Sequence, residues 1–186
     1  HLETAINRIV QQHDALRSRF VKQDGQWQQL FAASPETGSW FDAVTGNDHS
    51  ERFLSEDAGA LQASLSLEDG NVFRARHYQD AVSNDNKLLM VAHHLVIDGI
   101  SWRILLDDLN TALAQLAADK ELQLLPKTMS FKDWAGHLEQ FRSNGEMQVH
   151  RDYWNAISDQ PPATIPVDYP DGINSVQSTQ RIETSL

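Results

Sequence analysis

The chain has 186 residues, of which 40% are hydrophobic and 22% are charged, which is ordinary for a globular protein with a substantial core. It contains no cysteine, so a disulfide framework and a cysteine-based zinc site are both excluded. Its net charge is −11, and Lys and Arg are scattered along it, which argues against nucleic acid or an anionic membrane as partner. No apolar stretch is long enough to span a bilayer and no secretory signal opens the chain, so we expect a cytoplasmic protein.

The first 61 residues predict two helices and three strands. Apolar residues at helical spacing predict an amphipathic helix from Leu2 to Val10 that ends near His13. Strands are expected over 15–21 and 26–31, because Asp24-Gly25 between them is typical of a hairpin turn. A strand is expected over 39–44. Asp48 or Ser50 is expected to cap a helix whose apolar residues are Phe53, Leu54, Ala58 and Leu61.

The middle of the chain predicts two strands and a long helix. One strand is expected over 71–78, and a turn at 84–86 leads to a second over 87–92. The second strand is continuously apolar, which is typical of a strand buried on both faces. A helix over 101–118 carries one apolar stripe, made of Trp102, Leu105, Leu109, Leu113 and Leu116.

The last third predicts two more helices and an irregular tail. Ser130 and Asp133 resemble a capping box at the start of a helix, and Gly145 separates it from the next. Aromatic residues at helical spacing are expected to be core: Trp134, Tyr153 and Trp154. Prolines from residue 161 onward argue against regular structure, and 175–186 reads as extended. The whole pattern predicts an α/β fold, a two-layer sandwich with a mixed sheet and packed helices.

Two adjacent histidines stand where the strand over 87–92 gives way to a loop, in the run His93-His94-Leu95-Val96-Ile97-Asp98-Gly99. If the strand continued through them, their side chains would point to opposite faces, one toward a cavity and one into the structure. That geometry argues against a shared metal ion, and we expect no metal site. A site formed by Asp98 with His94 is the remaining alternative.

This run, continued by Ile100-Ser101-Trp102, resembles the core motif of the condensation-domain superfamily of nonribosomal peptide synthetases: two histidines, three variable residues, then Asp-Gly. The earlier run His13-Asp14-Ala15-Leu16-Arg17 is similar to another motif of that family. Condensation domains that elongate a chain usually have an aromatic residue and a serine after the glycine. A small aliphatic residue followed by Ser-Trp is typical of the epimerization branch, which this chain therefore resembles most.

The resemblance implies a fold of two lobes, each similar to chloramphenicol acetyltransferase, with the active site in a tunnel between them. The motifs fall in the amino-terminal lobe, which we assign to residues 1–159. Residues 160–186 would form a Pro-rich, extended crossover toward a carboxy-terminal lobe that is missing here. We therefore expect this chain to be a piece of a larger domain and inactive by itself.

The resemblance also implies a reaction and a catalytic residue. An epimerization domain inverts the α-carbon, from L to D, of an aminoacyl or peptidyl thioester on a carrier protein. His94 would remove the α-proton, since an imidazole can act as base or acid near neutral pH. Return of a proton to the opposite face of the α-carbon needs a second acid or base, which the family places in the other lobe. No cofactor is bound directly, because the 4′-phosphopantetheine arm belongs to the carrier. The competing interpretation is that His94 is a structural histidine in the core, with its hydrogen bonds made to the protein.

Three neighbours are expected to support His94. His93 is expected to be structural, with a hydrogen bond to nearby backbone. The resemblance implies a buried ion pair between Asp98 and Arg17 that braces the loop; the alternative is that Asp98 orients a histidine. Gly99 either permits a backbone shape or close approach that a Cβ would block, or is an ordinary turn glycine.

The start of the following helix carries further candidates. Ser101 caps the helix or contacts substrate, and Trp102 belongs to the core or lines the tunnel. The free N–H groups of the first helical turn are candidates for holding an oxyanion. Asp107 and Asp108 are expected to be solvated charges.

Two other functions compete with epimerization. In a condensation domain the same histidine would position or deprotonate an attacking amine, forming a peptide bond. A non-catalytic lobe would only dock carrier proteins. A serine hydrolase is disfavoured, because no serine has a Gly-x-Ser-x-Gly context. An acidic carrier as partner also requires a local basic patch that the sequence does not reveal.

Overall fold

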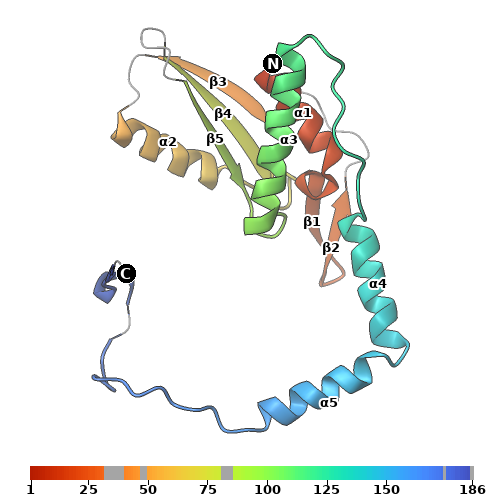
Figure 1. Cartoon of the computed structure of the whole chain (residues 1–186), viewed down its shortest axis with the longest axis vertical. Helices are drawn as coiled ribbons and strands as arrows, with labels where there is room; N and C mark the ends of the chain where they lie inside the picture. The colour runs from red at the N-terminus through yellow and green to blue at the C-terminus, as the bar shows by residue number, and fades with distance from the viewer. Residues whose placement is uncertain (32–39, 47–49, 81–85, 174, 185–186) are drawn as a thin grey trace. The chain divides into compact units, whose positions relative to one another are not determined.

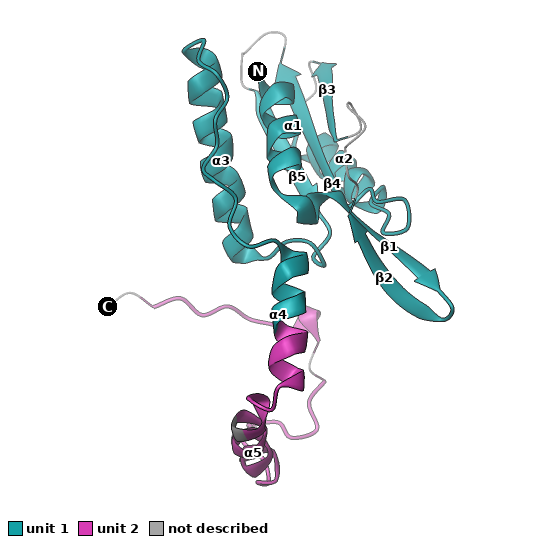
Figure 2. Cartoon of the chain, turned by 90° about the vertical axis from the view of Figure 1, so that its right-hand side faces the viewer, with its two compact units in different colours: residues 1–137 teal, residues 138–186 magenta. Residues whose placement is uncertain are grey.

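The computed structural model describes residues 1–31, 40–46, 50–80, 86–173 and 175–184. Its contacts divide the chain into two compact units, residues 1–137 and 138–186, coloured separately in Figure 2. The boundary expected after residue 159 marks the end of the amino-terminal lobe of the family fold, which is a different division, and it stays a prediction. No helix in the described part of the chain is both long and apolar enough to cross a membrane.

The first unit alternates helices and strands (Figure 1). In chain order its elements are α1 (Leu2–Gln12), the short 3-10 helix η1 (Asp14–Arg17), β1 (Ser18–Gln23), β2 (Gln26–Phe31), β3 (Phe41–Gly46), α2 (Glu51–Ala63), β4 (Phe73–Asp80), β5 (Lys87–Ala92), α3 (Gly99–Ala117) and the first half of α4 (Phe131–Ser143).

The strands form two separate sheets. β1 and β2 make an antiparallel hairpin, and its turn residues Asp24 and Gly25 have positive φ angles of 52° and 79°, as the Asp-Gly pattern predicts. The other sheet has the order β3-β4-β5. β3 runs parallel to β4, whereas β5 runs antiparallel to it, so the predicted mixed sheet is confirmed. Phe73 pairs with Ala92, which brings the end of β5 beside the start of β4.

The main core lies on one face of this sheet, where α1 and α3 pack side by side (Figures 1 and 2). Phe73 and Ala75 project from β4 into this core because alternate residues of a strand share a face. The helices contribute buried apolar residues: Ala5, Ile6, Ile9 and Val10 from α1, and Leu105, Leu109 and Ala112 from α3. Of the stripe predicted for α3, Leu105 and Leu109 are buried and the other three residues pack partly buried against the core, whereas Ala112 lies outside the predicted stripe.

The opposite face of the sheet is covered by α2. Arg76 and Tyr78 of β4 bind Asp57 of α2, and the rings of Tyr78 and Phe53 meet edge to face at 6.3 Å. The predicted α/β fold with packed helices is therefore confirmed. The prediction of two layers allowed for helices on one face of the sheet only, whereas α2 forms a helical layer on the other face.

Several boundaries differ from the predictions. Residues 15–17 belong to η1 and not to a strand, since a hydrogen bond from Leu16 N–H to the His13 carbonyl (3.0 Å) closes a tight turn there. β5 is not buried on both faces; it is an edge of the described sheet, and only Val91 in it is fully buried. Ser50 caps α2 through the Phe53 N–H at 3.3 Å. The predictions at Ser39, Asp48 and residues 84–85 lie outside the described residues.

The predicted cap of α4 is confirmed, because the Ser130 hydroxyl contacts Asp133 Oδ2 at 2.6 Å and accepts the Asp133 N–H at 3.1 Å. The predicted core role of the aromatic residues in α4 and in α5 (Met147–Ser158) is wrong: Trp134, Tyr153 and Trp154 are 52%, 62% and 61% exposed. Their spacing does make amphipathic helices, but no described element covers the apolar faces. In the described residues after α5, the one regular element is a 3-10 turn, Val176–Ser178, as the prolines lead one to expect.

Candidate functional site

The two histidines follow β5 directly. His93 N–H donates to the Val72 carbonyl at 2.9 Å, continuing the pairing of β5 with the start of β4. The strand then stops, and the Val96 N–H donates to the His93 carbonyl at 3.0 Å, closing a turn that contains His94. The prediction that a continuing strand separates the two rings is therefore wrong. The turn separates them instead, with His93 half-buried and His94 exposed.

The His93 ring is tied to its own turn. Its Nδ1 accepts the Leu95 N–H at 3.2 Å, which is the kind of backbone contact expected of it. With Nδ1 as acceptor, the neutral ring carries its hydrogen on Nε2.

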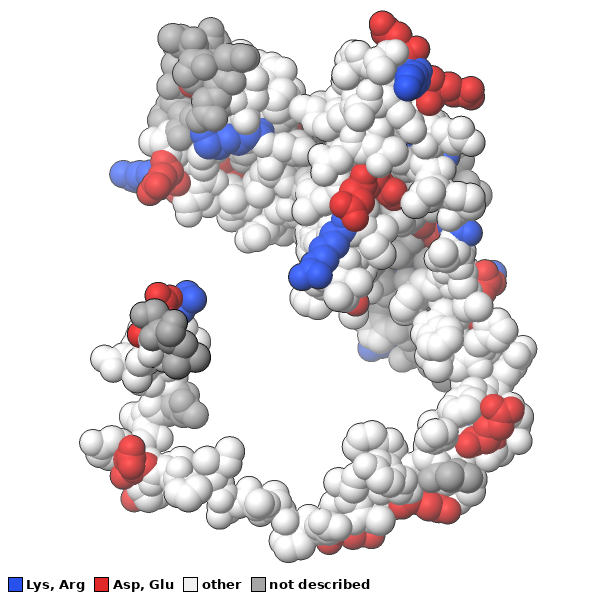
Figure 3. Space-filling view, in the orientation of Figure 1, with Lys and Arg blue, Asp and Glu red and all other residues white. Residues whose placement is uncertain are grey.

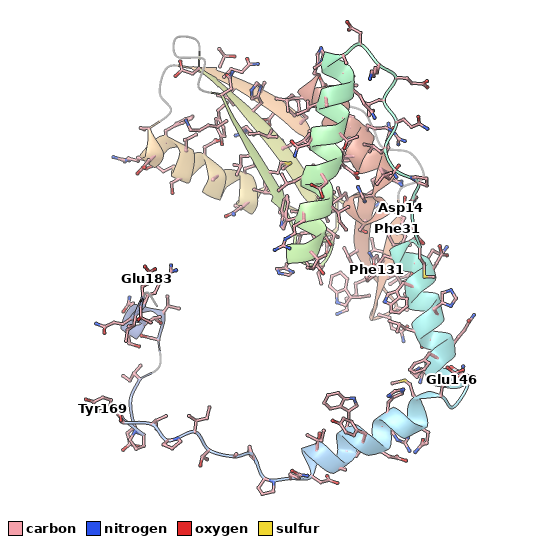
Figure 4. All side chains as sticks on the ribbon, viewed as in Figure 1. Asp14, Phe31, Phe131, Glu146, Tyr169 and Glu183 are labelled. Carbon is pink, nitrogen blue, oxygen red and sulfur yellow. The ribbon has the colours of Figure 1, made fainter. Side chains whose placement is uncertain are left out.

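His94 borders an open hollow of about 310 Å³, which we call the His94 hollow. Its wall comes from η1, β2, the motif loop and the starts of α3 and α4, with Ala15, Gln29, Asp98, Ser101 and Phe131 among the lining residues. Asp14 lines one neighbouring hollow with Phe131 and another with Phe31, and Figure 4 shows the three residues where β2 ends and α4 begins. His94 is thus reachable from solvent, and its interpretation as a core histidine is wrong.

Asp98 caps α3. Its carboxylate accepts both the backbone N–H and the hydroxyl of Ser101, each at 2.7 Å, so the helix begins at Gly99. The prediction that Ser101 caps the helix is wrong, because Ser101 donates to the cap. These two hydrogen bonds, the hydroxyl first, lower the pKa of Asp98 below its ordinary value, and the neighbouring His94 acts in the same direction.

The predicted ion pair between Asp98 and Arg17 is not formed. Arg17 pairs with Asp14, three residues earlier, and its Nε donates to the Val10 carbonyl at 3.1 Å. It therefore faces the carbonyl end of α1, while Asp98, which is exposed, faces the N-terminus of α3. Each charge is held by the helix terminus nearest to it.

Packing decides between the alternatives stated for two further motif residues, Gly99 and Trp102. A Cβ built on Gly99 meets no described atom within 4 Å and Gly99 lacks a positive φ, so the fold of this chain gives Gly99 no close approach to protect. Trp102 is half-buried against the main core, which confirms its core interpretation.

No three His, Asp or Glu side chains converge as metal ligands within the ranges that the structure describes. Lys and Arg are scattered over the face seen in Figure 3 and form no basic patch there.

Two polar clusters have no local sequence signal. His13 Nε2 lies 2.7 Å from Asp108 Oδ2, and the two side chains are 28% and 15% exposed. The prediction that Asp108 is a solvated charge is thus wrong. The two residues are 95 positions apart, and only the packing of α1 on α3 brings them together.

The second cluster joins α2 to the sheet. Arg76 binds Asp42 of β3 (2.6 and 2.8 Å) and Asp57 of α2 (2.8 and 2.9 Å), and the Tyr78 hydroxyl donates to Asp57 at 2.6 Å. Hydrogen bonds from Arg76 and from Tyr78 lower the pKa values of Asp42 and Asp57, respectively. Burial, with the Asp57 bond, raises the pKa of Tyr78 to about 12.

Comparison with known proteins identifies the family. The Condensation domain family matches residues 1–185. A polypeptide of the linear gramicidin synthase from Brevibacillus parabrevis is 35% identical over 189 residues, covering 100% of this chain and 2% of that protein. Gramicidin S synthase 1 from Brevibacillus brevis is 35% identical over 156 residues, covering 82% of this chain and 14% of the relative.

A solved epimerization domain, from the third module of tyrocidine synthetase B, has a similar structure. Its TM-score is 0.79 at 32% identity, over 90% of this chain and 38% of that one. The starter condensation domain of rhizomide synthetase, 14% identical with a TM-score of 0.69 over 86% of this chain and 38% of that one, has the same fold. The chain spans only a small part of the synthetases it matches, and it belongs to the Condensation domain family of peptide synthetases.

Proposed function

We propose that this chain supplies the amino-terminal lobe and the catalytic histidine of an epimerization domain. The observation that carries the proposal is the similarity to a solved epimerization domain, with a TM-score of 0.79 at 32% identity. The Ile100-Ser101-Trp102 run after the motif supports the same branch. The substrate class is an aminoacyl or peptidyl thioester held by a carrier protein.

The chemistry begins at the α-carbon. The imidazole of His94, exposed in its hollow, accepts the α-proton of the thioester. The electron pair of the broken C–H bond moves into the thioester carbonyl, giving an enolate. When a proton is delivered to the opposite face, the carbonyl re-forms and the configuration is inverted. The second acid or base lies outside this chain, so the chain alone does not epimerize.

The surroundings of His94 favour this role. Asp98 lines the same hollow and interacts electrostatically with His94, so its negative charge favours the positive charge that the imidazole gains with the α-proton. The expected use of the first N–H groups of α3 for an oxyanion is not supported, because the Asp98 carboxylate already accepts the backbone hydrogen bonds of Ser101 and Ile100 there.

The carrier protein contributes the rest of the substrate. Its 4′-phosphopantetheine arm would present the thioester in the His94 hollow, so the chain needs no bound cofactor of its own for the proton transfer.

The test uses the intact synthetase module with an L-aminoacyl group loaded on its carrier, in deuterated water. Epimerization predicts deuterium at the α-carbon and a mixture of L and D products after the thioester is cleaved. Peptide-bond formation without exchange would identify a condensation domain instead. Carrier binding with neither reaction would identify a docking lobe.

A further inference from the structure

We propose that a groove leading from His94 to the His13–Asp108 pair receives the side chain of the carrier-bound amino acid and prefers side chains that end in a hydrogen-bond donor. The inference rests on the proposed function, because it takes the tethered thioester to lie at His94. It assigns a role to a hollow and to a hydrogen-bonded His–Asp pair that the proton transfer does not use.

The groove consists of three hollows that share walls. The His94 hollow adjoins a middle hollow of about 180 Å³, and the two have Ala15, Val96, Ile97 and Ser101 in common. The middle hollow adjoins an outer hollow of about 310 Å³. Those two share four lining residues: His13, Ala15, Ile104 and Thr128. A path therefore runs from the proposed base to the His13–Asp108 pair.

One face of α3 forms a wall of the whole path. Ser101, Ile104 and Asp108 line the first, middle and outer hollows, and their spacing places them on one side of the helix. Ser101 and Asp108 are seven positions apart, which corresponds to about 10 Å along the helix. A long amino-acid side chain anchored beside His94 can therefore extend toward Asp108.

The middle hollow suits an apolar body. Its floor consists of buried side chains, Leu16, Ile97 and Leu105, which are 2%, 7% and 4% exposed. Ile104 stands at its rim and is 49% exposed. A volume of about 180 Å³ is more than ten times the ~15 Å³ that a single water needs in this measure. Filling it with a side chain removes apolar surface from water, which favours binding.

The far end carries a polar pair that is already ordered, in a hollow lined also by apolar side chains. Asp108 is held by His13 at 2.7 Å, so its position is fixed before a ligand arrives. A carboxylate accepts more than one hydrogen bond, which leaves Asp108 able to accept another from a hydroxyl, amide or indole N–H. Asp14 and Lys127, which pair with each other, line the same outer hollow, so their opposite charges offset one another there. The groove therefore selects tyrosine over phenylalanine.

The experiment measures α-deuteration by the intact module with its carrier loaded with L-alanine, L-phenylalanine or L-tyrosine. Ile104→Trp fills the rim of the middle hollow, so we expect the tyrosine-to-alanine rate ratio to fall about tenfold. Leu106→Trp is the matched control, since Leu106 is 45% exposed on α3 and lines none of the three hollows. Asp108→Ala should lower the tyrosine-to-phenylalanine rate ratio about tenfold, because the tyrosine hydroxyl loses its hydrogen-bond acceptor, whereas phenylalanine has no hydroxyl.

The groove is refuted if Ile104→Trp slows all three substrates equally, or if it changes the ratio no more than Leu106→Trp does. A purely structural His13–Asp108 pair would lower the melting temperature of Asp108→Ala and leave the tyrosine-to-phenylalanine ratio unchanged. If the wild-type module deuterates no substrate, the proposed function fails. The groove is then tested by binding of carriers that hold tyrosine or alanine through a stable amide. The groove is supported if Ile104→Trp weakens binding of the tyrosyl carrier more than binding of the alanyl carrier. It is contradicted if the substitution changes both affinities equally.

Discussion

Replacing Arg76 by methionine tests how α2 is held on the sheet. The guanidinium makes four hydrogen bonds of 2.6–2.9 Å to Asp42 and Asp57, and its side chain is 18% exposed. Methionine keeps most of the aliphatic length but removes the guanidinium from two partly buried carboxylates, leaving Asp57 with the Tyr78 hydroxyl and Asp42 with Arg74. Breaking a buried ion pair costs about 3–5 kcal/mol, and partial exposure reduces this to about 2–3 kcal/mol here.

The pH dependence of this effect has a defined sign. The pKa values of Asp42 and Asp57 are lowered in the folded protein from an ordinary value of 3.8. Their contribution to stability is therefore complete above pH 3.8 and is lost as the pH falls toward the folded-state values. The difference in unfolding free energy between wild type and Arg76→Met should be full at pH 7 and smaller at pH 3.5.

The assay is urea unfolding of the intact domain at both pH values, followed by far-UV circular dichroism. Arg52→Met is the matched control, because Arg52 pairs with Glu56 at 2.8 Å on the same helix but is 86% exposed. We expect the control to cost less than about 0.5 kcal/mol. An Arg76→Met variant as stable as this control, or a difference that does not shrink at low pH, would refute the reasoning.

Three further predictions concern stability and are measured by denaturation of the same domain. Ile6→Ala removes a side chain with 0% exposure from the α1–α3 core and should cost about 2–5 kcal/mol, whereas Leu125→Ala, at an 80% exposed position, should cost almost nothing. Gly25→Ala places a Cβ at φ 79° in the hairpin and should cost about 1 kcal/mol, while Gly99→Ala at the start of α3 should be neutral or slightly stabilising; equal effects would contradict the turn argument. Asp98→Ala should lower the melting temperature less than Arg76→Met, because Asp98 is an exposed helix cap; a larger drop would restore the idea of a buried brace.

The sequence predicts the elements of the first unit well because their periodicity is strong. Leu2–Gln12 and Gly99–Ala117 carry clear apolar stripes, and Asp24-Gly25 defines its hairpin by turn chemistry. Burial is harder to predict than periodicity. The stripe that contains Trp134 is as regular as the one in α3, but sequence spacing says nothing about what covers a helix.

At the site, the motif alone makes His94 the candidate catalytic residue, and the resemblance assigns the wrong partners to Asp98 and Arg17. The resemblance pairs Asp98 with Arg17, whereas local geometry gives each a nearer partner, Ser101 and Asp14. The His13–Asp108 pair has no sequence signal because it depends on how α1 packs against α3, which no local pattern encodes. Long-range polar contacts of this kind become visible only once the fold is known.

The most direct test of the account is the rate of α-deuteration of a carrier-bound L-aminoacyl group by the intact module in which His94 is replaced by alanine. His137→Ala serves as the matched control, since His137 is also exposed but lies in α4 and lines none of the three hollows. The account predicts that His94→Ala slows deuteration by about 10²–10⁴-fold, the usual contribution of a general base, while His137→Ala leaves the rate unchanged. Deuteration at the wild-type rate by a folded His94→Ala protein would contradict it.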